Sequence, residues 1–308
     1  MVSPPGYDAL LAGSAVVRRS DRGIVRLRGA DRVTWLQGLV TNDIAAIQPG
    51  HRIYSAYLTP QGRMITDLWV VAIPDSLLLD VPAPLAASLA TRLDGLIFAE
   101  DAQIDEVSGE LAVFQVFGST PADRIATALV SDDTYGMTSL AAYVATPEAP
   151  SFLASLSPAP VETTLDALDT LRIEAGVPRF LVDMTDETIP LEAGIEDRAI
   201  SFTKGCYVGQ EIIVRVTTRG GGRVARKLVG LVAPGAAVPL PAGSTLYAGD
   251  RAVGRITSSA ISPRRGDVIA LGYAHRDFTE PGTSLEIDAN GERRPVILHA
   301  LPFVPGNS

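Results

Sequence analysis

The sequence is short of the residues from which most metal and redox centres are built. Its 308 residues include one cysteine, Cys206, and three histidines. A single cysteine excludes a disulfide within the chain, and it excludes an iron–sulfur or zinc site that needs several thiolates of one chain. The histidines lie far apart, without the short spacing of metal ligands, so we expect no intrinsic metal. They are His51, His275 and His299.

Long apolar runs and an excess of positive charge are also missing. The most apolar segments, 68–73 and 77–79, fall far short of the ~20 residues that span a bilayer. No basic segment followed by an apolar core opens the chain, as a secretory signal would. The 35 acidic and 26 basic residues give a net charge of −9, which disfavours nucleic acid as the main partner. We expect a cytoplasmic monomer that does not enter membranes.

The pattern of predicted elements changes once along the chain and divides it into two regions. Up to residue 224, short strands alternate irregularly with helices, an order typical of α+β folds. After Gly220–Gly222, short β-rich segments between glycine and proline turns predict a small all-β barrel over 225–308. The expected strands of the first region are 24–28, 54–59, 64–73, 77–81, 103–106 and 111–116. Its expected helices are 32–40, 84–93, 165–175 and one that opens at Thr120-Pro121.

The segment Lys204–Glu211, KGCYVGQE, is the most unusual in the chain because two glycines bracket the only cysteine. Lys204 would favour the thiolate form of Cys206, and glycines let the backbone approach a ligand or partner closely. The alternative is structural, since most lone cysteines are small buried apolar side chains. The residues alone leave both interpretations open.

This octapeptide resembles the K-G-C-aromatic-x-G-Q-E signature of the YgfZ-type folate-binding proteins, which aid iron–sulfur cluster maintenance. Those proteins resemble in fold the aminomethyltransferase (T-protein) of the glycine cleavage system. Further segments resemble other elements of the family, in the same order, from about residue 24 to 303. They are VTWLQGLVTND at 33–43, YLTPQGR at 57–63, LRIEAGVP at 171–178, PLEAG at 190–194 and ALGY at 270–273.

The resemblance implies a three-lobed, aminomethyltransferase-like α+β fold. Two interwoven α+β lobes would occupy residues 1–224, and the C-terminal all-β barrel would close the ring. The implied ligand is tetrahydrofolate or a derivative, held in a central channel. The implied protein partners are iron–sulfur proteins or their assembly factors.

Two carboxylates are candidates for contacts with the folate ring. The resemblance gives Glu174 the role of binding the pterin, whose N–H and amine a carboxylate accepts as a pair. The alternative is a surface acid, or a partner of Arg172 or Arg179. Asp67 would hydrogen-bond ring nitrogens or act in catalysis, or else be a strand acid that faces solvent or pairs with Arg63. Aminomethyltransferases carry two adjacent carboxylates here, so the neutral Thr66 before Asp67 argues against aminomethyl transfer.

Other polar residues complete the candidate site. Asn42 would line it, or would close the first helix as an ordinary turn residue. Lys204 is expected to bind the ligand beside Cys206. The acid-free stretch 212–249 holds cations suited to the glutamate tail of a folate, and a hydrated basic linker is an equal alternative. These cations are Arg215, Arg219, Arg223, Arg226 and Lys227.

These residues support two functions and one further alternative. The first is a tetrahydrofolate-binding protein, not a usual turnover enzyme, that assists assembly or repair of iron–sulfur enzymes through Cys206. The second is a tetrahydrofolate-dependent aminomethyltransferase or demethylase, with Asp67 as its acid–base residue. In the third, the fold serves only contacts with other proteins, and apolar side chains would fill the channel.

Overall fold

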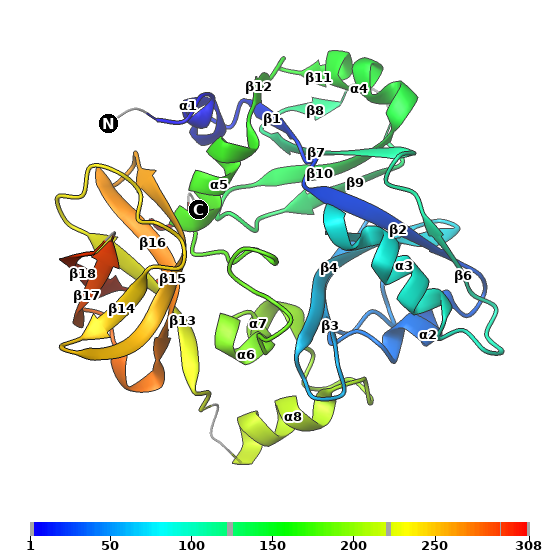
Figure 1. Cartoon of the computed structure of the whole chain (residues 1–308). Coiled ribbons are helices and arrows are strands. Elements are labelled where there is room, and N and C mark those ends of the chain that lie inside the picture. Colours follow the sequence, from blue (N-terminus) through cyan, green and yellow to red (C-terminus); the bar gives the residue numbers. More distant parts are fainter. Residues whose placement is uncertain (1–2, 122–125, 220–222, 290, 307–308) are drawn as a thin grey trace.

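Three lobes surround a central region of the molecule in the computed structural model shown in Figure 1. The structure describes residues 3–121, 126–219, 223–289 and 291–306. The lobes are two α+β layers and a closed barrel, and the short helices α6 (Pro190–Ala193) and α7 (Glu196–Ala199) lie between them. The three-lobed α+β fold expected from the sequence is therefore confirmed.

The first lobe is a five-stranded antiparallel sheet in the order β3-β4-β5-β2-β6. Helices α2 (Arg32–Gln37) and α3 (Ala86–Asp94) pack apolar side chains such as Leu36 and Leu89 into its core. The expected hairpin around 54–73 is confirmed as β3 and β4. The strands are β2 (Arg22–Arg28), β3 (Arg52–Leu58), β4 (Met64–Ile73), β5 (Ser76–Pro82) and β6 (Gln103–Glu106).

The second lobe is a five-stranded sheet in the order β12-β1-β7-β10-β9, in which only β1 and β12 run parallel. The chain enters this lobe with β1, builds β2–β6 of the first lobe, and then returns, so the two lobes are interwoven. The strands are β1 (Ala15–Arg18), β7 (Leu111–Phe117), β9 (Ala128–Asp132), β10 (Ser139–Ala145) and β12 (Val161–Thr163). The helices are α1 (Tyr7–Leu11), α4 (Ala149–Ser155) and α5 (Leu165–Glu174).

The prediction of a helix that opens at Thr120-Pro121 is wrong for these two residues. Thr120 and Pro121 form the two-residue strand β8, which pairs with β11 (Leu156–Ser157). A proline is compatible with this strand because the sheet has two strands, so both of them are edge strands. The continuation of the expected helix over 122–125 lies outside the described residues.

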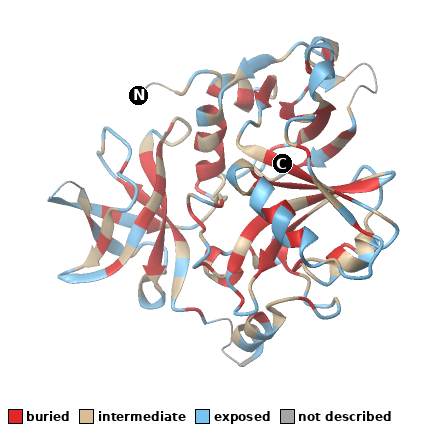
Figure 2. Ribbon diagram, turned by 45° about the vertical axis from the view of Figure 1, so that its right-hand side comes forward, coloured by how far each residue is buried: buried red, intermediate tan, exposed pale blue. Residues whose placement is uncertain are grey.

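The third lobe is a closed six-stranded barrel in the order β13-β16-β15-β14-β17-β18. Leu231, Ile256 and Val268 belong to the apolar core of this barrel, and Figure 2 shows buried residues along its strands and those of both sheets. The expected β-segments are confirmed, and β14 is additional. The strands are β13 (Arg226–Ala233), β14 (Thr245–Ala248), β15 (Arg251–Ser262), β16 (Asp267–His275), β17 (Ser284–Ala289) and β18 (Glu292–His299).

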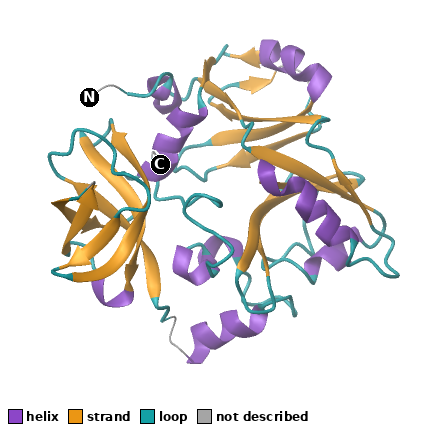
Figure 3. Cartoon of the chain, viewed as in Figure 1, coloured by secondary structure: helices purple, strands orange, loops and turns teal. Residues whose placement is uncertain are grey.

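The β-branched stretch after Gly209 is helical. It forms α8 (Gln210–Val214) and a π-helical turn, η3 (Arg215–Arg219), which Figure 3 shows beside the linker to the barrel. Ile213 is fully buried in the same core as Leu58 and Met64. This tertiary contact outweighs the strand preference of β-branched residues. No helix in the described part of the chain is long and apolar enough to cross a membrane.

Two glycines allow the first hairpin to lie against the start of α8. Gly62 has a φ of 74°, and a Cβ there would lie 2.8 Å from the Cβ of Ile212. Gly209 has a φ of 84°, and a Cβ there would lie 2.6 Å from the carbonyl oxygen of Thr59. Both positions therefore require glycine, for conformation and for space.

Gly209→Ala should lower the free energy of unfolding by ~1–3 kcal/mol, because alanine is strained at positive φ and its Cβ presses on Thr59. Gly205→Ala is the matched control, since nothing lies within 4 Å of a Cβ at that position. Its effect should stay within ~0.5 kcal/mol. Urea denaturation measures both, and equal stability of the two variants would contradict the close contact at Gly209.

Candidate functional site

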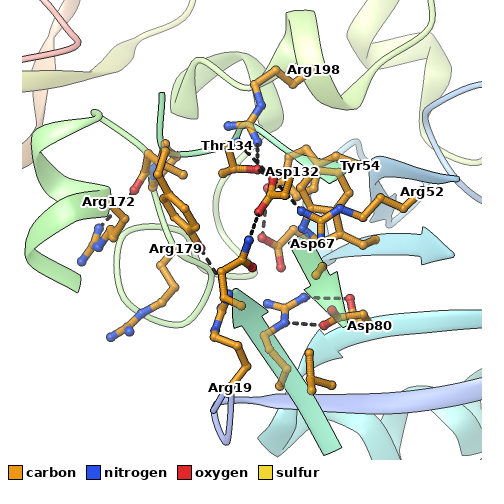
Figure 4. Close-up of a pocket in the computed structure, with 18 of the residues that line it drawn as sticks. Arg19, Arg52, Tyr54, Asp67, Asp80, Asp132, Thr134, Arg172, Arg179 and Arg198 are labelled. Atoms are coloured by element: carbon orange, nitrogen blue, oxygen red, sulfur yellow. Dashed lines mark hydrogen bonds and ion pairs between the residues drawn. The ribbon is translucent and has the colours of Figure 1, made fainter. Parts of the chain in front are cut away.

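A cavity lies between the two α+β lobes, and Figure 4 shows the side chains around it. Its empty space, with the open mouth included, is about 700 Å³. Strands β3, β4 and β5 face β7, β9 and β10 across it, and the end of α5 with residues 177–179 forms a further wall. Most of the side chains that line it are polar or charged. The apolar filling that a purely interaction-based function would require is therefore absent from this cavity as described.

Six arginines and three aspartates line the cavity within the described residues, and two of the aspartates have their charge matched. Asp80 on β5 accepts hydrogen bonds from Nε of Arg22 at 2.5 Å and from the hydroxyl of Tyr143 at 2.7 Å. Asp132, at the end of β9, lies 2.6 Å from Nη2 of Arg52. The charged lining residues are Arg19, Arg22, Arg52, Arg172, Arg179, Arg198, Asp67, Asp80 and Asp132.

Asp67 differs from the other two aspartates because one of its carboxylate oxygens lacks a partner. Its Oδ2 accepts from the hydroxyl of Tyr54 at 2.9 Å, whereas Oδ1 is buried without a hydrogen bond from any described residue. Burial raises the pKa of Asp67, and the nearby charge of Arg22 only partly opposes that rise. A buried polar atom without a partner is rare, and this one belongs to a residue that lines the cavity.

Thr66 points away from this cavity. Successive side chains of a strand face opposite sides of the sheet. Asp67 and Trp69 accordingly line the cavity, while Thr66 lines a groove beside Leu89 on α3. A carboxylate at position 66 would therefore not reach the cavity. The expectation that the neutral Thr66 argues against aminomethyl transfer loses its physical basis.

Two aromatic rings and two guanidinium groups form one wall. The ring centroids of Tyr54 and Trp69 are 5.0 Å apart. The guanidinium carbon of Arg52 lies 3.8 Å from the centroid of Trp69, and that of Arg198 lies 5.1 Å from the centroid of Tyr54. Aromatic faces beside fixed cations suit a flat ligand that carries negative charge.

Arg172 lies on α5 and is a cavity residue that the sequence analysis did not select. Its Nε donates to Asp169 at 2.9 Å and its Nη1 donates to Asp183, while its buried Nη2 has no partner among the described residues. Burial alone would lower the pKa of Arg172, but the two aspartates outweigh burial and raise it. The sequence did hold a signal for Arg172, because this charged residue stands between the apolar Leu171 and Ile173.

Glu174, expected to bind the pterin, does not line the cavity. Two residues along a helix are about 200° apart, so Arg172 faces the cavity while Glu174 faces the barrel. Glu174 is 1% exposed, and its two carboxylate oxygens accept hydrogen bonds from the hydroxyls of Tyr7 and Ser262. The expected pterin contact has no support in this placement, in which Glu174 joins α1, α5 and β15.

Asn42 and Lys204 bond to backbone oxygens and lie outside the lining of the cavity. The Nδ2 of Asn42 donates to the carbonyl oxygens of Tyr54 at 2.9 Å and Arg198 at 2.8 Å. Asn42 therefore positions two cavity residues from behind. The Nζ of Lys204 donates to three carbonyl oxygens at the end of α2, and burial lowers the pKa of Lys204 to about 8. The three acceptors are Gln37 at 2.7 Å, Val40 at 2.8 Å and Asn42 at 2.8 Å.

Cys206 is exposed, so the alternative of a buried apolar cysteine is wrong. The loop around it is anchored on both sides, by Lys204 on α2 and by the buried side chain of Tyr207. The thiol therefore faces solvent from a fixed backbone, outside the lining of the central cavity. Within the described residues, no group of three or more His, Cys, Asp or Glu side chains could hold a metal ion.

Four of the five cations expected to bind a folate tail also lie outside the lining of the central cavity, and the side chain of the fifth, Arg219, lies outside the described part of the structure. Arg215 and Arg223 are exposed. Arg226 pairs with Glu192 at 3.1 Å, and Arg223 and Lys227 line a separate surface hollow. Tail binding at these residues stays a prediction, and the cavity has arginines of its own.

Asp67→Asn should preserve or raise the free energy of unfolding at neutral pH, because it removes a buried charge and keeps an acceptor for Tyr54. Since the folded state raises the pKa of Asp67, the wild-type protein loses stability as pH rises from the ordinary value through the raised one. The advantage of the variant should therefore vanish in acid and grow as the pH rises. Thermal melting between pH 4 and 7 measures it.

Asp80→Asn is the matched control for that measurement. It removes the partner of the buried Arg22 and should cost ~3–5 kcal/mol. A loss of the same size in Asp67→Asn would contradict the assignment of Asp67 as the unpaired aspartate.

Two family models match the chain. Residues 9–147 match the GCVT N-terminal domain, and residues 226–305 match the glycine cleavage T-protein C-terminal barrel domain. A relative named aminomethyltransferase, from Rippkaea orientalis, is 29% identical over 316 residues, which cover 92% of this chain and 84% of the relative. A relative named iron-sulfur cluster assembly factor IBA57 homolog, mitochondrial, from Mycosarcoma maydis, is 30% identical over 240 residues, covering 72% and 58%.

A solved structure agrees with these matches at the level of the fold. The glycine cleavage system aminomethyltransferase T from Bartonella henselae superposes with a TM-score of 0.83 at 19% identity, over 99% of this chain and 91% of that one. The matched segments lie in the two α+β lobes and in the barrel, where the structure has the corresponding sheets. The chain therefore belongs to the glycine cleavage T-protein (GcvT) family, with both its N-terminal domain and its C-terminal barrel domain.

Proposed function

We propose that this chain binds a reduced folate, tetrahydrofolate or a derivative, in the central cavity. The observation that carries the proposal is the buried Oδ1 of Asp67, which lacks a partner among the described residues and belongs to a side chain that lines the cavity. A pterin presents an N–H and an amine side by side, and a carboxylate accepts such donors in strong charge-assisted bonds. Tyr54 and Trp69 add aromatic faces for a flat ring.

The acidic end of a folate would find its partners at the arginines of the cavity. The buried Nη2 of Arg172 is available for a carboxylate, and guanidinium groups pair with carboxylates in a directional way. A bound reduced folate would supply a carrier for a one-carbon unit, while these residues bind and orient it.

The proposed role of the folate-bound protein is to assist assembly or repair of iron–sulfur enzymes. The exposure of Cys206 on an anchored loop supports this role, as does the likeness to a relative named as an iron–sulfur cluster assembly factor. One thiol cannot hold a cluster alone, so the partner is an iron–sulfur protein or an assembly factor that supplies further ligands.

A second candidate is the transfer of an aminomethyl or methyl group to tetrahydrofolate. The raised pKa of Asp67, which burial causes, favours it because a general acid or base needs a pKa closer to the working pH. Several relatives are named aminomethyltransferase. Turnover of aminomethyl or N-methyl donors that requires both tetrahydrofolate and Asp67 would support this candidate, and its absence would leave the first.

Tetrahydrofolate should bind with a Kd of about 1 μM or lower, and Asp67→Asn should weaken it at least ~10-fold, because the amide cannot accept as a charge-assisted pair. Glu174→Gln is the control, since Glu174 lies outside the cavity lining. Isothermal titration calorimetry measures all three proteins. If the wild type does not bind, the folate proposal is lost. If only Glu174→Gln loses affinity, the anchor is Glu174 and Asp67 is not.

Cys206→Ser should leave the melting temperature and folate affinity unchanged, because the thiol is exposed and away from the cavity. It should nevertheless abolish support of iron–sulfur enzyme activity in cells that lack the native protein, since serine is a far weaker nucleophile and ligand. Thr203→Ala, another exposed position of the same loop, is expected to retain full support. Full support by Cys206→Ser would remove the chemical role of the thiol.

A further inference from the structure

Two adjacent hydroxyl groups of the barrel bond to one carboxylate outside the barrel. Thr257 and Ser258 on β15 donate to Oδ1 of Asp183 at 2.5 and 2.7 Å. The side chain of Asp183 is completely buried. Adjacent residues of a regular strand point to opposite faces and could not share one acceptor.

A β-bulge makes this arrangement possible. Ile256 lies opposite Gly272 on β16 and Ser258 lies opposite Leu271, so Thr257 is an extra residue in the ladder. Such a bulge redirects side chains and reverses the alternation beyond it. Ile256 accordingly belongs to the barrel core and Ile261, five positions later, packs against the same core. Past the bulge, Ser258 bonds to Asp183 and Ser262 bonds to Glu174 at the end of α5.

The other oxygen of Asp183 reaches the central cavity through Arg172. Oδ2 accepts from Nη1 of Arg172 and, at 3.0 Å, from the backbone N–H of Arg179. With Asp169 bound at Nε, the guanidinium is held along two edges. Only Nη2 remains without a partner among the described residues, on a residue that lines the cavity.

We propose that Asp183, oriented by the bulge hydroxyls of Thr257 and Ser258, is a positioning residue that couples the docking of the barrel to the affinity of the cavity for its anionic ligand. The barrel thereby takes part in ligand binding although none of its residues lines the cavity within the described chain. This inference rests on the proposed function, because it names what orients the residue that would meet the ligand's carboxylate.

The two hydroxyls have a structural and a directional effect. They satisfy Oδ1 of the completely buried Asp183, which would otherwise lack these partners. Because they bond to the oxygen opposite Arg172, they also fix the orientation of the carboxylate and of the guanidinium bound to it. By linkage, a ligand that binds more tightly when the barrel is docked must stabilise that docking by the same factor.

The test is the double variant Thr257→Val and Ser258→Ala, which removes both hydroxyls and keeps nearly the same side-chain shape. Calorimetry with tetrahydrofolate should give an affinity about 10-fold lower than that of the wild type. Ser259→Ala is the matched control, because Ser259 donates to the carbonyl oxygen of Leu240. It should bind like the wild type, and Thr257→Ser with Ser258 retained should also bind normally. An affinity for the double variant equal to that of Ser259→Ala would overturn the proposal.

A second measurement works without ligand and separates this inference from the proposed function. The Nε–H of Arg172 should exchange slowly in the wild type and in Ser259→Ala, and at least several-fold faster in the double variant, as followed by ¹⁵N NMR. If tetrahydrofolate does not bind the wild type, the folate proposal fails, and this exchange rate alone decides the inference. Unchanged exchange would overturn it. Should the double variant not fold, the single variants Thr257→Val and Thr257→Ser decide by the same two readouts.

Discussion

An arginine cannot lose its charge, so an arginine buried beside the central cavity needs an acidic partner. For the most deeply buried of these arginines three ion pairs meet this need, and two of the pairs join strands that are distant in the sequence. The pair of Arg52 and Asp132 links β3 of the first lobe to β9 of the second, with both side chains 5% exposed or less. The same ion pair therefore holds the two lobes together and balances charge in the cavity. The pairs are Arg22–Asp80, Arg52–Asp132 and Arg172–Asp183.

Asp67 is the exception to this balance, and the exception has functional meaning. Stability alone would not favour a buried carboxylate oxygen without a partner, since its desolvation is not repaid. Tyr54 holds the carboxylate in place through the other oxygen, and Trp69 packs beside Tyr54. Such an arrangement is typical of a binding site, because a ligand can donate the hydrogen bond that the folded protein does not provide.

In the KGCYVGQE loop, some residues anchor the backbone and the cysteine is exposed. Gly209 allows the loop to contact the first hairpin, and Lys204 binds three carbonyl oxygens at the end of α2. Tyr207 is buried. Cys206 takes no part in this anchoring and is exposed. The residues around the cysteine thus account for the backbone of the loop, and they leave the thiol free to meet another molecule.

The sequence by itself determined most of the elements and the family, because hydrophobic period, turn residues and ordered motifs are local properties. It also identified Asp67, which the alternation of β4 places in the cavity together with Trp69. It did not distinguish Arg172 from Glu174, two charged residues at one helix end. That choice depends on which face of α5 the barrel covers, and the barrel lies more than fifty residues further along the chain. The bulge at Thr257 likewise has no local signal, since only the pairing of β15 with β16 reveals the extra residue. Tertiary structure decided these points because the direction of a side chain is set by what packs against its element, and those partners are distant in the sequence.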